Sequence, residues 1–226
     1  QRQMCIRDRF DVEVTRRQID VKTVNYRMMD DNIGYIQIEE FDEVTSDQFS
    51  QALDSLIEQG MEALVIDIRN NPGGILDTVV AMLDELLPEG TIVSVKDRNG
   101  TAQEYTSDAD TKLTVPLTVL INGNSASASE IFAGAIKDYG VGTLVGTTTY
   151  GKGIVQTAFS LSDGTGVKIT IEDYYLPSGK SIHKVGVDPD VEIDLPDELK
   201  TYVTIPEDED VQLQKAIEIM KEQLQK

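Results

Sequence analysis

The 226-residue chain is poor in the residues that form disulfides and clustered metal sites, with one cysteine and one histidine. It also has no tryptophan. The lone Cys5 cannot form a disulfide within the chain, and the lone His183 cannot build a zinc site of clustered histidines. We therefore expect no metal ion in this protein. In addition, no run of about 18 apolar residues is present to form a membrane-spanning helix.

Basic residues are also scarce. Lysine and arginine number 20 against 40 aspartates and glutamates, which gives a net charge of −20. Such a charge argues against nucleic acid and against an anionic membrane surface as partners, because both attract basic protein surfaces. The remaining composition is that of a globular protein, with 40% hydrophobic residues to form a core.

The chain divides into four expected parts. Residues 1–9 (QRQMCIRDR) have no periodicity and are set aside as a non-native or disordered stretch. Residues 10–30 are expected to form an extended segment, residues 31–192 the core, and residues 193–226 a C-terminal segment with a helix.

Strands and helices alternate through the first part of the core, which indicates βαβ units and a mostly parallel sheet. The expected strands are Ile33–Ile38, Ala63–Ile68, Thr91–Val95, Leu117–Ile121 and Val141–Gly146. Four helices are expected. The first begins near Thr45, the second spans Leu76–Leu87, the third lies within Asn122–Gly140, and the fourth ends the chain. Two alternating stretches around Ser162–Gly166 predict a β-hairpin extension.

Three loops follow strands of the expected sheet, and ligands bind beyond the carboxyl ends of such strands. They are Asn70–Gly74, Asn122–Ser127 and Thr147–Gly153. If their strands are neighbours, a glycine pair, a serine cluster and a lysine converge on one crevice. The glycine turn is either an ordinary tight turn or a source of N–H groups for an oxyanion.

The serine cluster holds Ser125, Ser127 and Ser129 just before an apolar helix. Ser127 and Glu130 have the spacing of a capping box, so Ser127 is a candidate helix cap. The local pattern favours the cap, but a nucleophile at this turn is also physically sensible, because the helix N-terminus stabilises developing negative charge. Both roles therefore stay open.

A serine nucleophile needs a base, and two residues qualify. His183 lies far along the chain in a polar stretch and would have to return to the site. Lys152 lies between two glycines, which allow close backbone approach, but it must be uncharged to accept a proton. The segment Gly146–Lys152 also approximates a phosphate-binding loop. We reject that interpretation because Gly153 stands where serine or threonine is needed, and a strand pattern follows.

Four segments in this order resemble the carboxyl-terminal processing, or tail-specific, serine protease family. They are Asp67–Gly74 (DIRNNPGG), Asn122–Ile136, Gly146–Gln156 and Tyr174–Ile182 with the following Val187–Asp190. The resemblance extends over about residues 10–192. It implies an α/β fold with a ClpP/crotonase-like core.

The resemblance assigns a role to each candidate residue. It implies Ser127 as the nucleophile, Lys152 as the base and Gln156 as the residue that orients the lysine. The N–H groups of Ala128 and Gly73, the first of the two adjacent glycines, would form the oxyanion hole. A spacing of four within a strand would put the lysine and the glutamine on one face.

The same resemblance implies a serine endopeptidase that cuts polypeptides at or near their C-termini without a cofactor. Members act outside the cytoplasm, so we expect a periplasmic, cell-envelope or secreted location. Whether the parent protein is anchored to a membrane stays open at this point. A PDZ domain usually precedes the core, and at most its final strand, Phe10–Arg16, is expected here. The sequence does not decide whether the chain self-associates.

Two other classes of function remain open. One is a crotonase-like CoA enzyme, which would need neither Lys152 nor Gln156. The other is a binding module that keeps the fold without hydrolysing anything.

Overall fold

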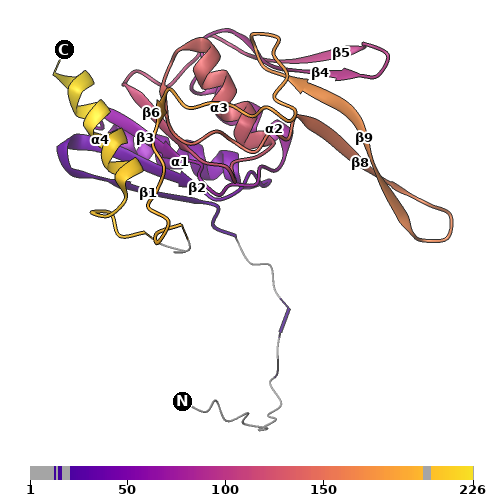
Figure 1. Ribbon diagram of the computed structural model, residues 1–226, viewed down its shortest axis with the longest axis horizontal. Helices are drawn as coiled ribbons and strands as arrows, with labels where there is room; N and C mark the ends of the chain where they lie inside the picture. Colours follow the sequence, from indigo (N-terminus) through magenta and orange to yellow (C-terminus); the bar gives the residue numbers. More distant parts are fainter. Residues whose placement is uncertain (1–12, 14, 17–20, 201–204, 226) are drawn as a thin grey trace.

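The computed structural model describes residue 13 and residues 15–16, 21–200 and 205–225 (Figure 1). The expectations for residues 1–9, and for most of residues 10–20, lie outside this part of the chain. The helices are α1 (Thr45–Glu58), α2 (Leu76–Asp84), α3 (Ala128–Tyr139) and α4 (Val211–Leu224), with a short 3-10 helix η1 (Asp30–Asn32). The strands are β1 (Val24–Met28), β2 (Ile33–Ile38), β3 (Ala63–Asp67), β4 (Gly90–Asp97), β5 (Ala102–Ser107), β6 (Leu117–Ile121), β7 (Thr143–Gly146), β8 (Ile154–Ser160), β9 (Gly166–Tyr175) and β10 (Val191–Glu192).

The main sheet has six strands in the order β1-β2-β3-β6-β7-β10. All its neighbours pair in parallel except β1, which is antiparallel to β2. Every residue of β3 and β6 is buried, as expected for central strands covered on both faces. The mostly parallel sheet predicted from the sequence is confirmed. It aligns the loops after β3, β6 and β7 along one edge.

A second sheet is antiparallel, in the order β5-β4-β9-β8. The predicted hairpin is confirmed as β8 and β9, which project from the body as a long ribbon (Figure 1). The strand expected at residues 91–95 is present as β4. It pairs with β5 and β9 and therefore belongs to this second sheet. Strand β5 was not predicted, because its sequence AQEYTS is polar and largely exposed.

The larger core lies between one face of the main sheet and helices α1, α2 and α3. Its largest fully buried side chains include Phe49 of α1, Met82 of α2 and Phe132 of α3. The rings of Phe41 and Phe132 have centroids 6.2 Å apart. This packing fixes the start of α3, which follows directly on the serine cluster.

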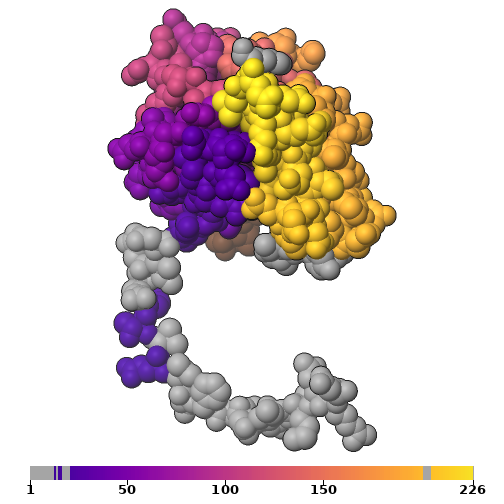
Figure 2. Space-filling view, turned by 90° about the vertical axis from the view of Figure 1, so that its left-hand side faces the viewer, coloured from indigo at the N-terminus to yellow at the C-terminus, as the bar shows by residue number. Residues whose placement is uncertain are grey.

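Helix α4 covers the opposite face of the sheet. Leu213, Ala216 and Met220 pack there against strand residues such as Ile33 and Val65. The space-filling view shows this C-terminal segment, in yellow, beside the indigo N-terminal strands (Figure 2). No helix in the described residues is long and apolar enough to cross a bilayer.

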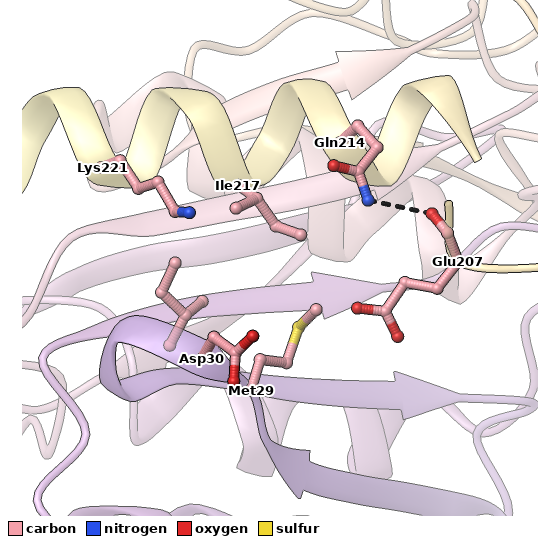
Figure 3. A pocket seen from close by; sticks show the side chains of 7 residues that line it. Met29, Asp30, Glu207, Gln214, Ile217 and Lys221 are labelled. Atoms are coloured by element: carbon pink, nitrogen blue, oxygen red, sulfur yellow. Dashed lines mark hydrogen bonds between the residues drawn. The ribbon is translucent and has the colours of Figure 1, made fainter. Parts of the chain in front are cut away.

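A small pocket of about 150 Å³ lies between α4 and the turn that joins β1 to β2 (Figure 3). Gln214 donates from Nε2 to the carbonyl oxygen of Glu207 at 2.9 Å, and Lys221 pairs with Asp31 at 2.7 Å. None of the candidate site residues lines this pocket, which lies under the helix that closes the fold.

Candidate active site

The loops after β3 and β6 are joined by side-chain amides at the carboxyl edge of the sheet. Asn70 donates from its backbone N–H to Asn122 Oδ1 at 2.9 Å. Its own Oδ1 accepts from Asn122 Nδ2 and from Asn124 Nδ2, each at 2.9 Å. The third loop, after β7, joins them where the Tyr150 N–H donates to the Ser125 carbonyl oxygen at 3.0 Å. The expected convergence of the three loops is confirmed.

Two of the three clustered serines support the backbone. Ser125 donates from Oγ to the Ile68 carbonyl oxygen at 2.8 Å, and Ser129 donates to the Asn71 carbonyl oxygen at 2.9 Å. Both serines are fully buried. Their hydroxyls hold the glycine turn against the start of α3. Ser127 is the remaining candidate for chemistry.

Ser127 occupies the N-cap position of α3 in an unusual backbone conformation, with φ 57° and ψ −114°. A non-glycine residue at positive φ costs about 1–3 kcal/mol and persists only where its surroundings hold it. Such residues gather at functional sites. The N-terminal end of α3, where the first N–H groups have no partner within the helix, follows directly on this serine.

Glu130 ties the serine to the lysine loop. The carboxylate is fully buried, and Oε2 accepts from the N–H of Ser127 at 2.9 Å and of Lys152 at 2.7 Å. Its Oε1 accepts from the N–H of Gly151 at 2.6 Å and from the Thr149 hydroxyl at 2.7 Å. The expected capping box is present, and it extends to a second loop. The sequence signalled only the Ser–Glu spacing, because the partners of the other oxygen lie about 20 residues away in the chain.

The lysine loop packs closely on the segment that follows β9. A Cβ on Gly153 would lie 2.6 Å from the His183 backbone nitrogen, and one on Gly151 would lie 3.1 Å from the Val185 nitrogen. The two glycines therefore permit the close approach that the sequence predicted. His183, the alternative base, does return to this loop, and its Nδ1 is buried without a hydrogen-bond partner.

Lys152 is half-buried and lines an open pocket of about 460 Å³. The other lining residues are Asn70, Pro72, Asn124, Ala126 and Tyr150. All three loops thus contribute to the pocket, and Ala126 places its wall directly beside Ser127. A hydrogen bond from the Ser127 hydroxyl to the lysine amine stays a prediction.

Tyr174 is a further residue beside the serine that the sequence analysis did not single out. It lies near the end of β9, is 6% exposed, and its N–H donates to the Gly153 carbonyl oxygen at 3.0 Å. Burial raises the pKa of Tyr174, and its side-chain hydrogen bond with Ser127 acts in the opposite direction. The phenol is therefore protonated at neutral pH, and it lies beside the hydroxyl of the candidate nucleophile Ser127.

The glycine turn touches the other side of Ser127. Gly73 has φ +99°, and a Cβ there would lie 2.8 Å from Ser127 Cβ and 2.9 Å from the Ala128 nitrogen. The N–H of Gly73 donates to Asn71 Oδ1 at 2.8 Å. Ala128 is the first residue of α3, whose initial N–H groups have no partner within the helix. The assignment of these two N–H groups to an oxyanion hole stays a prediction.

Gln156 lies on β8 and is exposed, and its Nε2 donates to Thr170 Oγ1 at 3.4 Å. Strand β8 begins at Ile154, so Lys152 precedes it, and the pairing with β9 shifts between Val155 and Gln156. Strand periodicity alone therefore does not fix how the lysine and the glutamine face each other. The orienting role of Gln156 stays a prediction.

Peptidase family S41 matches residues 32–193 of the chain. A carboxyl-terminal-processing protease of Synechocystis sp. is 38% identical over 211 residues, covering 92% of this chain and 49% of the relative. The carboxy-terminal processing protease CtpA of Bacillus subtilis is 39% identical over 192 residues, covering 84% of this chain and 41% of the relative.

The solved structure of a photosystem II D1 C-terminal processing protease is similar in fold, with a TM-score of 0.72 and 36% sequence identity. The alignment covers 82% of this chain and 53% of that one. The chain thus spans about half the length of these three proteins.

Proposed function

Because the chain belongs to peptidase family S41, we propose that it is the catalytic core of a serine endopeptidase that cuts polypeptides at or near their C-termini. The observation that carries the proposal is Ser127. It is held at φ 57° on the N-terminus of α3 and is joined through the Glu130 carboxylate to the backbone of Lys152. Strain of this kind at a helix N-terminus is suited to presenting a nucleophile.

In the proposed reaction, the uncharged amine of Lys152 takes the proton from Ser127 Oγ as this oxygen attacks a peptide carbonyl carbon. The tetrahedral intermediate collapses, the C–N bond breaks, and the leaving amine takes the proton from the lysine. A water molecule then hydrolyses the acyl-enzyme, with Lys152 again accepting and returning a proton. Gln156 orients the lysine in this scheme.

Negative charge on the substrate oxygen would be stabilised by the N–H groups of Ala128 and Gly73. The 2.9 Å between a Cβ on Gly73 and the Ala128 nitrogen supports the pairing, because it sets the two backbones side by side. Gly73 would exchange its bond to Asn71 Oδ1 for one to the substrate. Losing one such donor costs about 10²–10³ in rate.

The proposed substrate is a polypeptide that enters the open pocket lined by all three loops. The C-terminal site of cutting is supported by the names of the similar proteases of Synechocystis and Bacillus subtilis. An extracytoplasmic location of the parent protein is part of the same proposal, and cell fractionation with an antibody to this chain tests it.

The experiment that tests the function compares casein and peptide cleavage by the parent chain, Ser127→Ala and Lys152→Ala. Lys180→Ala, which removes an exposed lysine, is the matched control. We expect both site variants to lose at least about 10³-fold in kcat/KM, because nucleophile and base act as a unit. The control should keep the parental rate. Equal rates in all four proteins would contradict the proposal.

Two other results would indicate a different function on the same fold. A CoA enzyme on the same fold would instead keep its activity in Lys152→Ala. A binding module would leave Ser127 unlabelled by a fluorophosphonate. Each of these results would replace the protease proposal.

A further inference from the structure

The side chain of Arg69 lies almost out of solvent beneath the candidate site, with 10% of its side-chain surface exposed. Its Nε donates to Asp67 Oδ1 at 3.0 Å, and Nη2 donates to Asp67 Oδ2 at 2.6 Å and to Asp210 Oδ2 at 2.8 Å. Its Nη1 donates to Asp210 Oδ1 at 2.9 Å and to Gln212 Oε1 at 3.0 Å. All five N–H donors of the guanidinium therefore have acceptors.

These acceptors come from distant parts of the chain. Asp67 ends β3 and also accepts from the Tyr35 hydroxyl of β2 at 2.8 Å. Asp210 is the N-cap of α4 and accepts from the Leu213 N–H at 3.0 Å. Gln212, in the first turn of α4, donates to the Ile193 carbonyl oxygen at 2.8 Å. The guanidinium thus joins the end of a central strand to the start of the C-terminal helix, which lies 141 residues further along the chain.

Arg69 also leads directly into the glycine turn. Its backbone N–H donates to Asp67 Oδ1 at 3.0 Å, and the next residue, Asn70, is bonded to the loop that carries the serine cluster. Further along the turn, Gly73 lies against Ser127 and Ala128. A movement of Arg69 would therefore also move the turn, because only one or two peptide units separate them.

We propose that Asp210 is a positioning residue for the reaction. By holding Arg69, it fixes the turn Asn70–Gly74 in the geometry that receives the substrate carbonyl. This inference rests on the proposed function. It makes catalysis depend on the docking of α4, because the acceptors that complete the Arg69 fork on that side come from the start of this helix.

The chemistry of the fork explains why a carboxylate is needed at residue 210. Both of its oxygens face N–H groups of Arg69, and one of them also caps α4. An asparagine keeps one oxygen for the cap and presents an amide NH₂ where the second oxygen stood. That NH₂ would meet another donor, so the guanidinium would have to turn away.

The test measures kcat and KM for peptide cleavage by the full chain, by Asp210→Asn and by Asp208→Asn. Asp208 is exposed in the same acidic segment, so its variant carries the same change of charge. We expect Asp210→Asn to lower kcat about tenfold to a hundredfold while KM changes less than about threefold, because only the reacting geometry moves. Asp208→Asn should match the parent.

A double-variant cycle decides whether Asp210 acts through Arg69. Arg69→Lys keeps the positive charge and loses the fork. In that background, Asp210→Asn should lower kcat by less than about twofold. The same loss of kcat in both backgrounds would overturn the inference.

If Asp210→Asn does not fold, Gln212→Leu replaces it in the test. This variant removes one acceptor of the fork and should lower kcat with KM unchanged. A parental kcat in Gln212→Leu would overturn the inference.

The outcomes separate the two proposals. A parent that cleaves no faster than Ser127→Ala overturns the proposed function and this inference with it. A parent whose cleavage depends on Ser127, together with a parental kcat in Asp210→Asn, overturns the positioning role alone.

Discussion

Replacing Glu130 with glutamine tests the link between the nucleophile and the lysine loop. The carboxylate accepts four hydrogen bonds, two at each oxygen, and three of the donors are backbone N–H groups. Glutamine has the same shape but only one acceptor oxygen. We expect that oxygen to stay between the N–H groups of Ser127 and Lys152. The NH₂ would then turn toward Thr149, whose hydroxyl is able to accept.

This arrangement leaves the Gly151 N–H without a partner, and the Thr149 hydroxyl proton loses its acceptor as well. A buried unpaired N–H costs about 1–3 kcal/mol, and the bonds that remain lose the extra strength that a charged acceptor gives. We therefore expect the free energy of unfolding to fall by about 1–3 kcal/mol. Gly151 is adjacent to Lys152, so a shift of the loop by about 1 Å should lower kcat by about a hundredfold.

The assay pairs urea unfolding, followed by circular dichroism because the chain has no tryptophan, with kcat for peptide cleavage. Glu89→Gln is the matched control, since Glu89 is exposed and the change of charge is the same. The reasoning fails if Glu130→Gln is as stable and as active as the parent. Lower stability with a parental kcat would limit Glu130 to a structural role.

Two further substitutions test the turn and the cover of the sheet. Gly73 and Gly60 both have a positive φ, but a Cβ would meet neighbouring atoms within 3 Å only at Gly73. We therefore expect kcat to fall about a hundredfold for Gly73→Ala and to stay unchanged for Gly60→Ala. Similar activities of the two variants would refute the role of the turn. Met220→Ala should lower the free energy of unfolding by about 2–5 kcal/mol, whereas Leu224→Ala, at a residue 37% exposed, should change it by under about 1 kcal/mol in the same urea titration. Equal effects would show that α4 does not contribute to the core as described.

The parallel sheet was predictable because its strands carry a plain signal. The runs that became β3 and β6 are apolar at nearly every residue, as burial on both faces requires. The placement of β4 was not predictable, since its apolar pattern suits either sheet. Its neighbours β5 and β9 decide the matter, and β5 is too polar to be recognised alone.

The candidate site divides in a similar way. Residue types at strand ends pointed to Ser127, Lys152 and the glycine turn, because parallel strands bring such loops to one edge. The roles of Glu130 and Tyr174 depend on loops that meet only in the folded chain. A local sequence pattern does not show contacts between distant segments, so the sequence indicates only the capping role of Glu130 and gives no signal for Tyr174.

The backbone at residue 127 has one more implication. A glycine would rest there without penalty, whereas serine is held at a positive φ by its neighbours. The protein therefore carries a conformational cost of about 1–3 kcal/mol at the N-terminus of α3 that a glycine would avoid.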